Sequence, residues 1–253
     1  MAGRLRLRGA DAETIGLLGV MRSMASRDRK RQITVMTTSE RLEMAERKAK
    51  ELSSLILEWE RVHANNRHLT YGTVFAGNLA HTFAGNAFAL LRLSSFAYEL
   101  TRLAALWDRP SEDRVSIPEV SALINDVDVK AALKQKCLSN YSDPDIGFLR
   151  SDAEKRFEYN YSMSIRLTDA VLRSRRLKTL RDHRDKWYAH NLEPEVLRPK
   201  FGYERKMRLT SQRVANALTG VISDSGFDYA DTVRICRKHA DEFWQGLSWS
   251  PPK

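Results

Sequence analysis

Cysteine, glycine and proline are all scarce in this chain of 253 residues, and each scarcity excludes a class of protein. The two cysteines, Cys137 and Cys236, are about a hundred positions apart, which excludes a disulfide scaffold and a cysteine-rich zinc module. The 12 glycines and 7 prolines are too few for a many-stranded fold with a tight turn every dozen residues. Free thiols are typical of a reducing compartment, so we predict a cytoplasmic protein.

Long apolar runs are also missing. The stretch from Ile15 to Met24 is too short to span a bilayer and is interrupted by Arg22. We therefore expect no membrane contact. Asp11 and Glu13 separate this stretch from the basic start of the chain, which is unlike a signal peptide. We predict a basic, disordered arm over residues 1–36, and internal methionines leave open whether this arm belongs to the native protein.

Several motifs that bind cofactors or metals are absent. The chain has no GxGxxG turn, no phosphate-binding Walker loop and no HExxH helix. Its 6 histidines form no cluster with well-spaced carboxylates. We therefore predict neither a metal nor a cofactor.

Positive charge is in excess and unevenly distributed. The chain carries 42 Lys and Arg against 32 Asp and Glu, a formal net charge of +10. Residues 1–37 contribute +5 and residues 150–213 contribute +8, so the remainder is slightly acidic. Such concentrated basicity favours a polyanionic partner, because lysine and arginine release counterions from phosphates. A solvated basic surface is the alternative, and composition does not separate the two.

The periodicity of apolar residues predicts an all-α bundle of about six helices in one domain, residues 37–253. Thr37 with Glu40, and Ser116 with Glu119, match the capping-box pattern that begins a helix. We predict that the second helix is the most buried one, because it is rich in alanine, phenylalanine and leucine. We also predict one long fourth helix. The helices are expected at residues 37–62, 71–107, 116–138, 148–189, 211–222 and 229–247.

The end of the long fourth helix carries the one segment with a chemical interpretation. It reads Leu-Arg-Asp-His-Arg-Asp-Lys-Trp-Tyr-Ala-His-Asn over residues 180–191. This segment resembles the HEPN superfamily of all-α domains. Their signature is an arginine and a histidine with four to six residues between them, the first of which is polar. Arg184, Asp185 and His190 fit that signature. The pattern Arg-Asp-Lys-x-x-Ala-His looks most like the abortive-infection AbiU-type branch, and the helix order agrees over residues 38–245.

Arginine–histidine spacing by itself is weak evidence, because chance yields about two such pairs in a chain this rich in arginine. Arg184 and His190 are preferred for their context: the following Asp185, the alanine before the histidine, and a helix about to end. His183 is the rival. Four pairs have the required spacing, namely Arg61–His68, Arg176–His183, Arg184–His190 and Arg234–His239.

On a helical wheel, Arg184 and His190 lie about 60° to either side of Trp187, which continues the apolar stripe. The pair therefore brackets the line along which this helix would meet a partner. In HEPN dimers two such motifs face each other across a cleft. The resemblance thus implies a homodimer with the site at the interface.

RNA cleavage without a metal needs these residue types. An imidazole that titrates near neutrality, His190, accepts the proton of the 2′-hydroxyl. A permanent guanidinium cation, Arg184, stabilises the charge that builds on the phosphoryl oxygens. Asp185 would orient either side chain, and Asn191 would contact the phosphate or cap the helix. The expected products are a 2′,3′-cyclic phosphate and a 5′-hydroxyl.

A basic run precedes the motif and would hold the RNA backbone. The alternative is a solvated helix end whose cations complement the helix dipole, with His190 capping carbonyls. We expect Trp187 and Tyr188 to pack at an interface rather than stack on bases. The predicted RNA-binding residues are Arg173, Arg175, Arg176, Lys178 and Arg181.

The leading hypothesis is therefore a HEPN-like, metal-independent endoribonuclease. By resemblance it would be a toxin or antiphage component with RNA as substrate and an antitoxin as a further partner. The alternative is a non-catalytic HEPN-type module that binds nucleic acid or a partner protein. A structural helical protein with incidental charge is the third hypothesis.

Overall fold

The computed structural model describes residues 28–29, 31–72, 84–143, 146–188, 204–225 and 229–246. These residues form helices and no strand, which confirms the all-α prediction. Two single turns, the 3₁₀ turn η1 (Gly147–Leu149) and the π-helical turn η2 (His183–Tyr188), separate longer elements. The α-helices are α2 (Thr38–Tyr71), α4 (Ala84–Ala105), α5 (Ile117–Ile124), α6 (Val127–Ser139), α7 (Arg150–Leu172), α8 (Arg175–Asp182), α9 (Glu204–Ser223) and α10 (Tyr229–Gly246).

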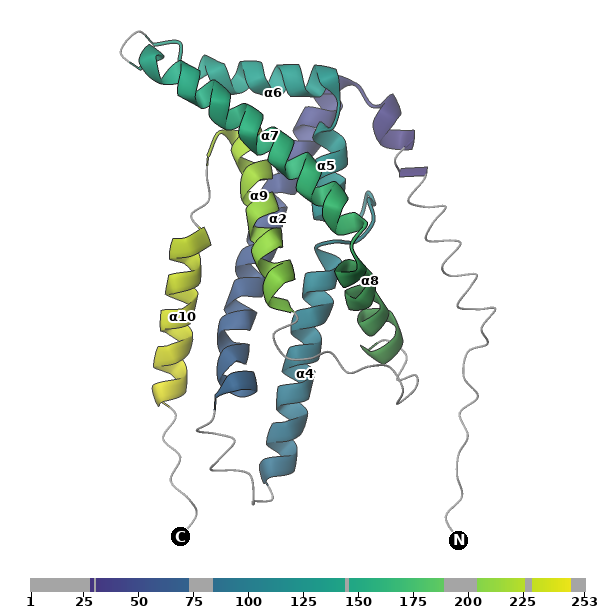
Figure 1. The fold of residues 1–253 in the computed structure, drawn as a ribbon, viewed down its shortest axis with the longest axis vertical. Helices are drawn as coiled ribbons and strands as arrows, with labels where there is room; N and C mark the ends of the chain where they lie inside the picture. The colour runs from purple at the N-terminus through teal and green to yellow at the C-terminus, as the bar shows by residue number, and fades with distance from the viewer. Residues whose placement is uncertain are drawn as a thin grey trace.

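Helix α2 is the axis of the bundle. Helices α4, α9 and α10 pack along it, and α7 crosses α9 on the front face in Figure 1. Helix α6 lies beside α7 at one end of the molecule, and α8 follows α7 toward the other end (Figure 1). The main core is continuous through these helices and includes Leu52, Ile56, Leu103, Trp107 and Leu218, each at most 1% exposed. No helix among the described residues is long and apolar enough to cross a membrane.

The predicted helix starts at Thr37 and Ser116 are both present. The Thr37 amide donates to Glu40 Oε2 at 2.8 Å and the Glu40 amide donates to Thr37 Oγ1 at 3.3 Å, a complete capping box. Ser116 Oγ accepts the Glu119 amide at 3.3 Å. The single helix expected over 116–138 is wrong, because Asp126 interrupts it. Its carboxylate accepts two amides at the start of α6 and so begins a new helix.

Helix α2 continues past the end predicted for it near residue 62. The polar residues that suggested a break are instead paired with neighbouring helices, so they interrupt nothing. His63 Nδ1 lies 2.6 Å from Glu99 Oε1 of α4, and Asn66 donates to Glu99 Oε2 at 2.9 Å. His68 Nε2 lies 2.8 Å from Asp241 Oδ1 of α10. Both histidines are therefore paired with carboxylates of other helices.

The first half of α4 contradicts the prediction that this is the most buried helix. Leu90, Leu91 and Leu93 are 65%, 51% and 45% exposed, and burial begins only at Phe96. Figure 1 shows that this end of α4 projects beyond α2 and α9. Composition predicted burial, but no other described helix lies beside these leucines to cover them.

The long fourth helix is interrupted. Helix α7 ends at Leu172, and Ser174 adopts an extended conformation with φ −76° and ψ 141°. Its Oγ accepts the Leu177 amide at 3.2 Å, which begins α8 as a separate helix. The apolar stripe survives the break, because Phe157 of α7 and Leu180 of α8 are both in the main core.

Residues before Thr37 also belong to the packed body. Residues 28–29 and 31–35 are helical, and we call this the N-terminal segment. Arg29 is only 6% exposed and Ile33 only 3%. The prediction of a disordered arm through residue 36 is therefore wrong for the N-terminal segment, while residues 1–27 lie outside the described residues.

Candidate active site at the end of helix α8

The backbone around Arg184 is a π-helical turn, η2, that directly follows α8. Buried Leu177 and Leu180 anchor α8 against the core. A π-helical turn is wider than an α-turn and is frequent at functional sites. The 100° step of an α-helix therefore does not hold across residues 183–188, and the wheel geometry predicted around Trp187 does not apply.

Two carboxylates hold the Arg184 guanidinium. Nη1 donates to Asp108 Oδ1 at 2.6 Å and Nε donates to Asp185 Oδ1 at 2.9 Å. The Arg184 side chain is 19% exposed. Burial alone would lower the pKa of Arg184, but the hydrogen bonds to Asp108 and Asp185 outweigh it and raise the pKa. Arg184 is thus a permanently charged group with a defined orientation, and its Nη2 has no partner among the described residues.

Asp108 was not identified as a site residue from the sequence. It follows α4 and is 76 positions from Arg184, so no local pattern connects the two. Sequence reasoning interpreted the stretch from Asp108 only as a helix stop. A buried neighbour, Trp107, anchors this stretch because its indole Nε1 donates to Ser211 Oγ at 2.8 Å.

Asp185 is where the sequence places it, beside Arg184 and in hydrogen-bonding contact with it. The orienting role of Asp185 stays a prediction, as does a role in catalysis.

His183, the rival base, is 4% exposed. Its Nδ1 has no hydrogen-bond partner among the described residues. Burial lowers the pKa of His183, and the charge of Asp182 opposes that shift in part. Burial therefore favours the neutral imidazole, which lies beneath the surface.

The predicted RNA-binding residues divide into two groups. Arg173, Arg175, Arg176 and Lys178 are exposed around the α7–α8 junction. Arg181 instead turns inward and donates through Nη2 to the Trp107 carbonyl, and burial lowers its pKa. The Arg181 guanidinium thus holds the backbone next to Asp108, and its contact with RNA stays a prediction.

A shallow groove of about 650 Å³ continues the exposed basic residues along α7. Arg166 and Arg173 line it together with Tyr161 and, from α6, Lys130. The Lys130 ammonium lies 4.8 Å from the centre of the Tyr161 ring. Sequence reasoning missed Lys130, Tyr161 and Arg166. Arg166 and Arg173 are seven positions apart, which is about two helical turns, and this spacing was the signal available for finding this face.

The AbiU2 model of HEPN domains matches residues 43–243. The chain belongs to this AbiU2 family. The match extends from α2 into α10 and so includes Arg184, Asp185 and the groove. This confirms the predicted resemblance to HEPN domains and to their AbiU-type branch. No curated protein and no solved structure matches the chain.

Part of the predicted AbiU2 motif lies outside the described residues. His190 and Asn191 are both in this category, as are the side chains of Trp187 and Tyr188. Among the described residues, no three His, Cys, Asp or Glu side chains come together as a metal site would require. Cys137 and Cys236 are buried free thiols, and burial raises the pKa of Cys137 to about 11.

Proposed function

We propose that this AbiU2-family HEPN domain is a metal-independent endoribonuclease that acts in abortive infection. The observation that carries the proposal is the arrangement of Arg184. Its guanidinium is largely buried and donates to two carboxylates, while Nη2 has no partner among the described residues. A rigidly positioned cation is what transition-state stabilisation at a phosphoryl group requires. The motif supplies the second group, His190, six positions later.

The proposed reaction is an attack by the RNA on itself. His190 accepts the 2′-hydroxyl proton, and the 2′-oxygen forms a bond to the adjacent phosphorus. The bond from phosphorus to the 5′-oxygen breaks, and that oxygen takes a proton from water as it leaves. Arg184 Nη2 binds a phosphoryl oxygen while negative charge accumulates on it, and Asn191 contacts the same phosphate. His183 is the weaker candidate for the base because it is almost fully buried.

RNA is the proposed partner of the exposed basic surface. Arg166, Arg175 and Lys178 have no ion pair among the described residues, so their charges are available to phosphates. Helix α8 contributes about 12 Å between the groove and Arg184, since an α-helix rises 1.5 Å per residue. A strand bound in the groove would therefore reach the motif within a few nucleotides.

A homodimer with the site at its interface is part of the same proposal. The exposed leucines 90, 91 and 93 of α4 provide an apolar surface for a second copy. Helix α4 also packs against η2, so a partner that covers α4 would lie near Arg184. In abortive infection, a neutralising protein partner would keep such a nuclease silent, and we propose an antitoxin in that role.

A non-catalytic module that binds nucleic acid is the second candidate function. The observation in its favour is that Asp108 and Asp185 together offset the charge of Arg184. A guanidinium neutralised in this way would contribute little to catalysis if no substrate displaced either carboxylate.

Cleavage assays with purified protein distinguish the two functions. We expect wild type to cleave single-stranded RNA in EDTA and to leave 2′,3′-cyclic phosphate ends. Arg184→Ala and His190→Ala should each lose about 10²-fold or more in kcat, with His190→Ala keeping its RNA affinity and Tm. Arg213→Ala, an exposed arginine of α9, is the matched control and should cleave normally.

Three outcomes would count against the nuclease. Cleavage by His190→Ala at the wild-type rate removes the proposed base. Complete loss of cleavage in EDTA contradicts the metal-independent mechanism. Salt-sensitive RNA binding without any cleavage by wild type supports the binding module instead.

A further inference from the structure

We infer that Asp108 is a positioning residue for Arg184, and that a buried clamp around Lys48 holds the loop that carries Asp108. The inference rests on the proposed function, because it assigns these residues to the reaction at Arg184. It adds residues of α2, the α4–α5 loop and the N-terminal segment to a set of catalytic residues that the sequence placed wholly on residues 180–191.

Both the backbone amide and the carboxylate of Asp108 have partners. Its amide donates to the Ala105 carbonyl at 3.0 Å, and its side chain is 16% exposed. Oδ1 accepts from Arg184 at 2.6 Å, while Oδ2 lies 3.5 Å from Arg114 Nη1. The preceding Trp107 is fully buried, and its carbonyl accepts from Arg181. The carboxylate therefore presents one defined oxygen to the Arg184 guanidinium.

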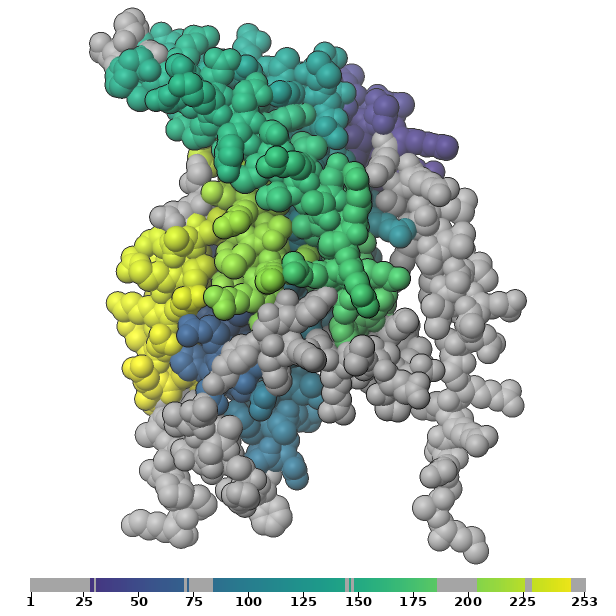
Figure 2. Space-filling view, in the orientation of Figure 1, coloured from purple at the N-terminus to yellow at the C-terminus, as the bar shows by residue number. Residues whose placement is uncertain are grey.

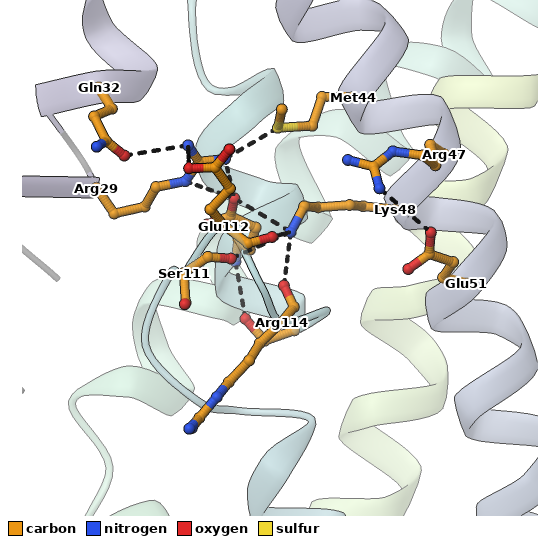
Figure 3. Close-up of polar contacts among 11 residues, drawn as sticks. Arg29, Gln32, Met44, Arg47, Lys48, Glu51, Ser111, Glu112 and Arg114 are labelled. Carbon is orange, nitrogen blue, oxygen red and sulfur yellow. Dashed lines mark hydrogen bonds and ion pairs between the residues drawn. The ribbon is translucent and has the colours of Figure 1, made fainter. Parts of the chain in front are cut away.

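The loop between α4 and α5 is held at its far end by Lys48 of α2. The Lys48 side chain is buried at 1% exposure, and Nζ donates to the carbonyls of Ser111, Glu112 and Arg114 at 3.2, 2.9 and 2.7 Å. Figure 3 shows these bonds converging on one ammonium. An ammonium has three N–H donors, so three carbonyls satisfy all of them. A surface lysine would not select one loop conformation in this way.

Arg29 of the N-terminal segment and Glu119 of α5 form the clamp together with Lys48. Glu119 is 0% exposed, and its Oε1 accepts from Arg29 Nε at 3.1 Å and Nη2 at 2.9 Å. The same oxygen lies 3.7 Å from Lys48 Nζ. Buried charges are tolerated when they are paired and hydrogen-bonded, and removal of one partner leaves the others unsatisfied. Arg29, Lys48 and Glu119 therefore act as a unit that holds the loop against the body.

Positioning matters for a cation that binds a transition state. A displacement of about 1 Å at a reacting group can reduce the rate about 10²-fold. Arginine has a long, flexible side chain, so an acceptor on a rigid loop restricts its guanidinium to one orientation. Asp185, on the same turn as Arg184, holds only Nε.

A double-mutant cycle tests the role of Asp108. We expect Asp108→Ala to lower kcat for RNA cleavage about 10- to 100-fold with little change in KM, and to cause no further loss in an Arg184→Ala background. Asp108→Asn, which keeps an acceptor oxygen, should restore most of the rate. Asp113→Ala removes an exposed carboxylate from the same loop and is the control. Additive losses in the cycle would overturn the inference.

Nitrogen-15 NMR of the Arg184 Nη1–H protons, one of which is donated to Asp108, gives a readout that does not depend on cleavage. Hydrogen exchange at this group should accelerate in Asp108→Ala and in Lys48→Met, and stay unchanged in Asp113→Ala. If Lys48→Met does not fold, Arg29→Gln is measured against the same criterion. Unchanged exchange in the folded clamp variants would overturn the clamp. Absence of cleavage by wild type would instead contradict the proposed function, while the exchange data would still test the positioning.

Discussion

The orientation of Arg184 depends on one contact with a neighbour in the sequence and on one contact with a distant residue. Its neighbour Asp185 is encoded next to it, and the sequence predicted that contact. Its stronger constraint, Asp108, comes from another helix end. The same contrast applies to His183, whose identity is evident in the sequence but whose burial is decided by packing. The chemistry of both residues therefore depends on contacts that no local motif describes.

The burial of His183 predicts that stability falls on acidification. The pKa of His183 is lowered from 6.5 in the folded state, so the unfolded chain binds this proton at a higher pH than the folded one. The free energy of unfolding should therefore decrease as pH falls below about 6.5. His183→Gln should flatten this dependence, measured as urea unfolding between pH 5 and 7.5 relative to wild type. His239→Gln, at an exposed site on α10, is the control, and an unchanged slope in His183→Gln would contradict the prediction.

Individual helices show that composition and burial can disagree. Helix α4 is rich in alanine, phenylalanine and leucine, yet leucines 90, 91 and 93 are exposed. Helices α7 and α8 share one apolar stripe, yet Ser174 separates them by accepting a backbone amide. In both cases the sequence identified the helical residues correctly. It did not predict which face of α4 stays exposed or where the long helix is interrupted.

The exposed surface of α4 predicts an interface between two copies. Leu90→Glu with Leu91→Glu should convert a dimer into a monomer, because two buried carboxylates at an interface have no partner for their charge. Sedimentation equilibrium measures the change. Val127→Glu, a substitution at an exposed apolar residue of α6 (83% exposed), is the matched control and should leave the dimer intact. A wild-type monomer at high concentration would contradict the dimer.

At the scale of the whole molecule, the cations behind the net charge of +10 fall into a buried group and an exposed group. Arg29 and Lys48 are buried and belong to the clamp, while Arg181 and Arg184 are engaged at the α4–α5 loop. Arg166 and Arg173 of the groove and the cations of the α7–α8 junction are exposed, whereas Lys130 of the groove is paired with Glu158. Basic composition suggested a polyanionic partner, and the fold separates the cations that can reach such a partner from those that hold the structure together.

This separation predicts the salt dependence of RNA binding. Replacing Arg166, Arg173 and Lys178 by glutamine should weaken binding at least about 10-fold and reduce the slope of log Kd against log salt by about 2, roughly 0.7 per lost phosphate contact. Fluorescence anisotropy in a His190→Ala background avoids cleavage. The control replaces Arg47, Lys50 and Lys238, which are exposed on α2 and α10, and changes the net charge equally. Equal losses in both variants would indicate a general charge effect rather than a binding groove.

Local patterns in the sequence were sufficient for much of the fold. The capping-box patterns at Thr37 and Ser116, the spacing of apolar residues and the Arg-Asp-Lys-x-x-Ala-His segment each involve neighbours within a few turns. They predicted an all-α chain, two helix starts and the AbiU2 family. They failed at His63 and Asn66, because both residues pair with Glu99 of another helix and so α2 continues past them. They also failed at Asp126, because its carboxylate accepts nearby amides and begins a new helix.

By itself, the sequence determined the class of fold, the family and the identity of Arg184 and Asp185 as candidate site residues. Only the tertiary structure decided that Asp108 holds Arg184, that Lys48 fixes the α4–α5 loop that carries Asp108, and that Arg181 turns inward. The physical reason is distance along the chain. Helical periodicity and capping depend on residues a few positions apart, whereas a buried ion pair depends on which helix ends the folded core brings together.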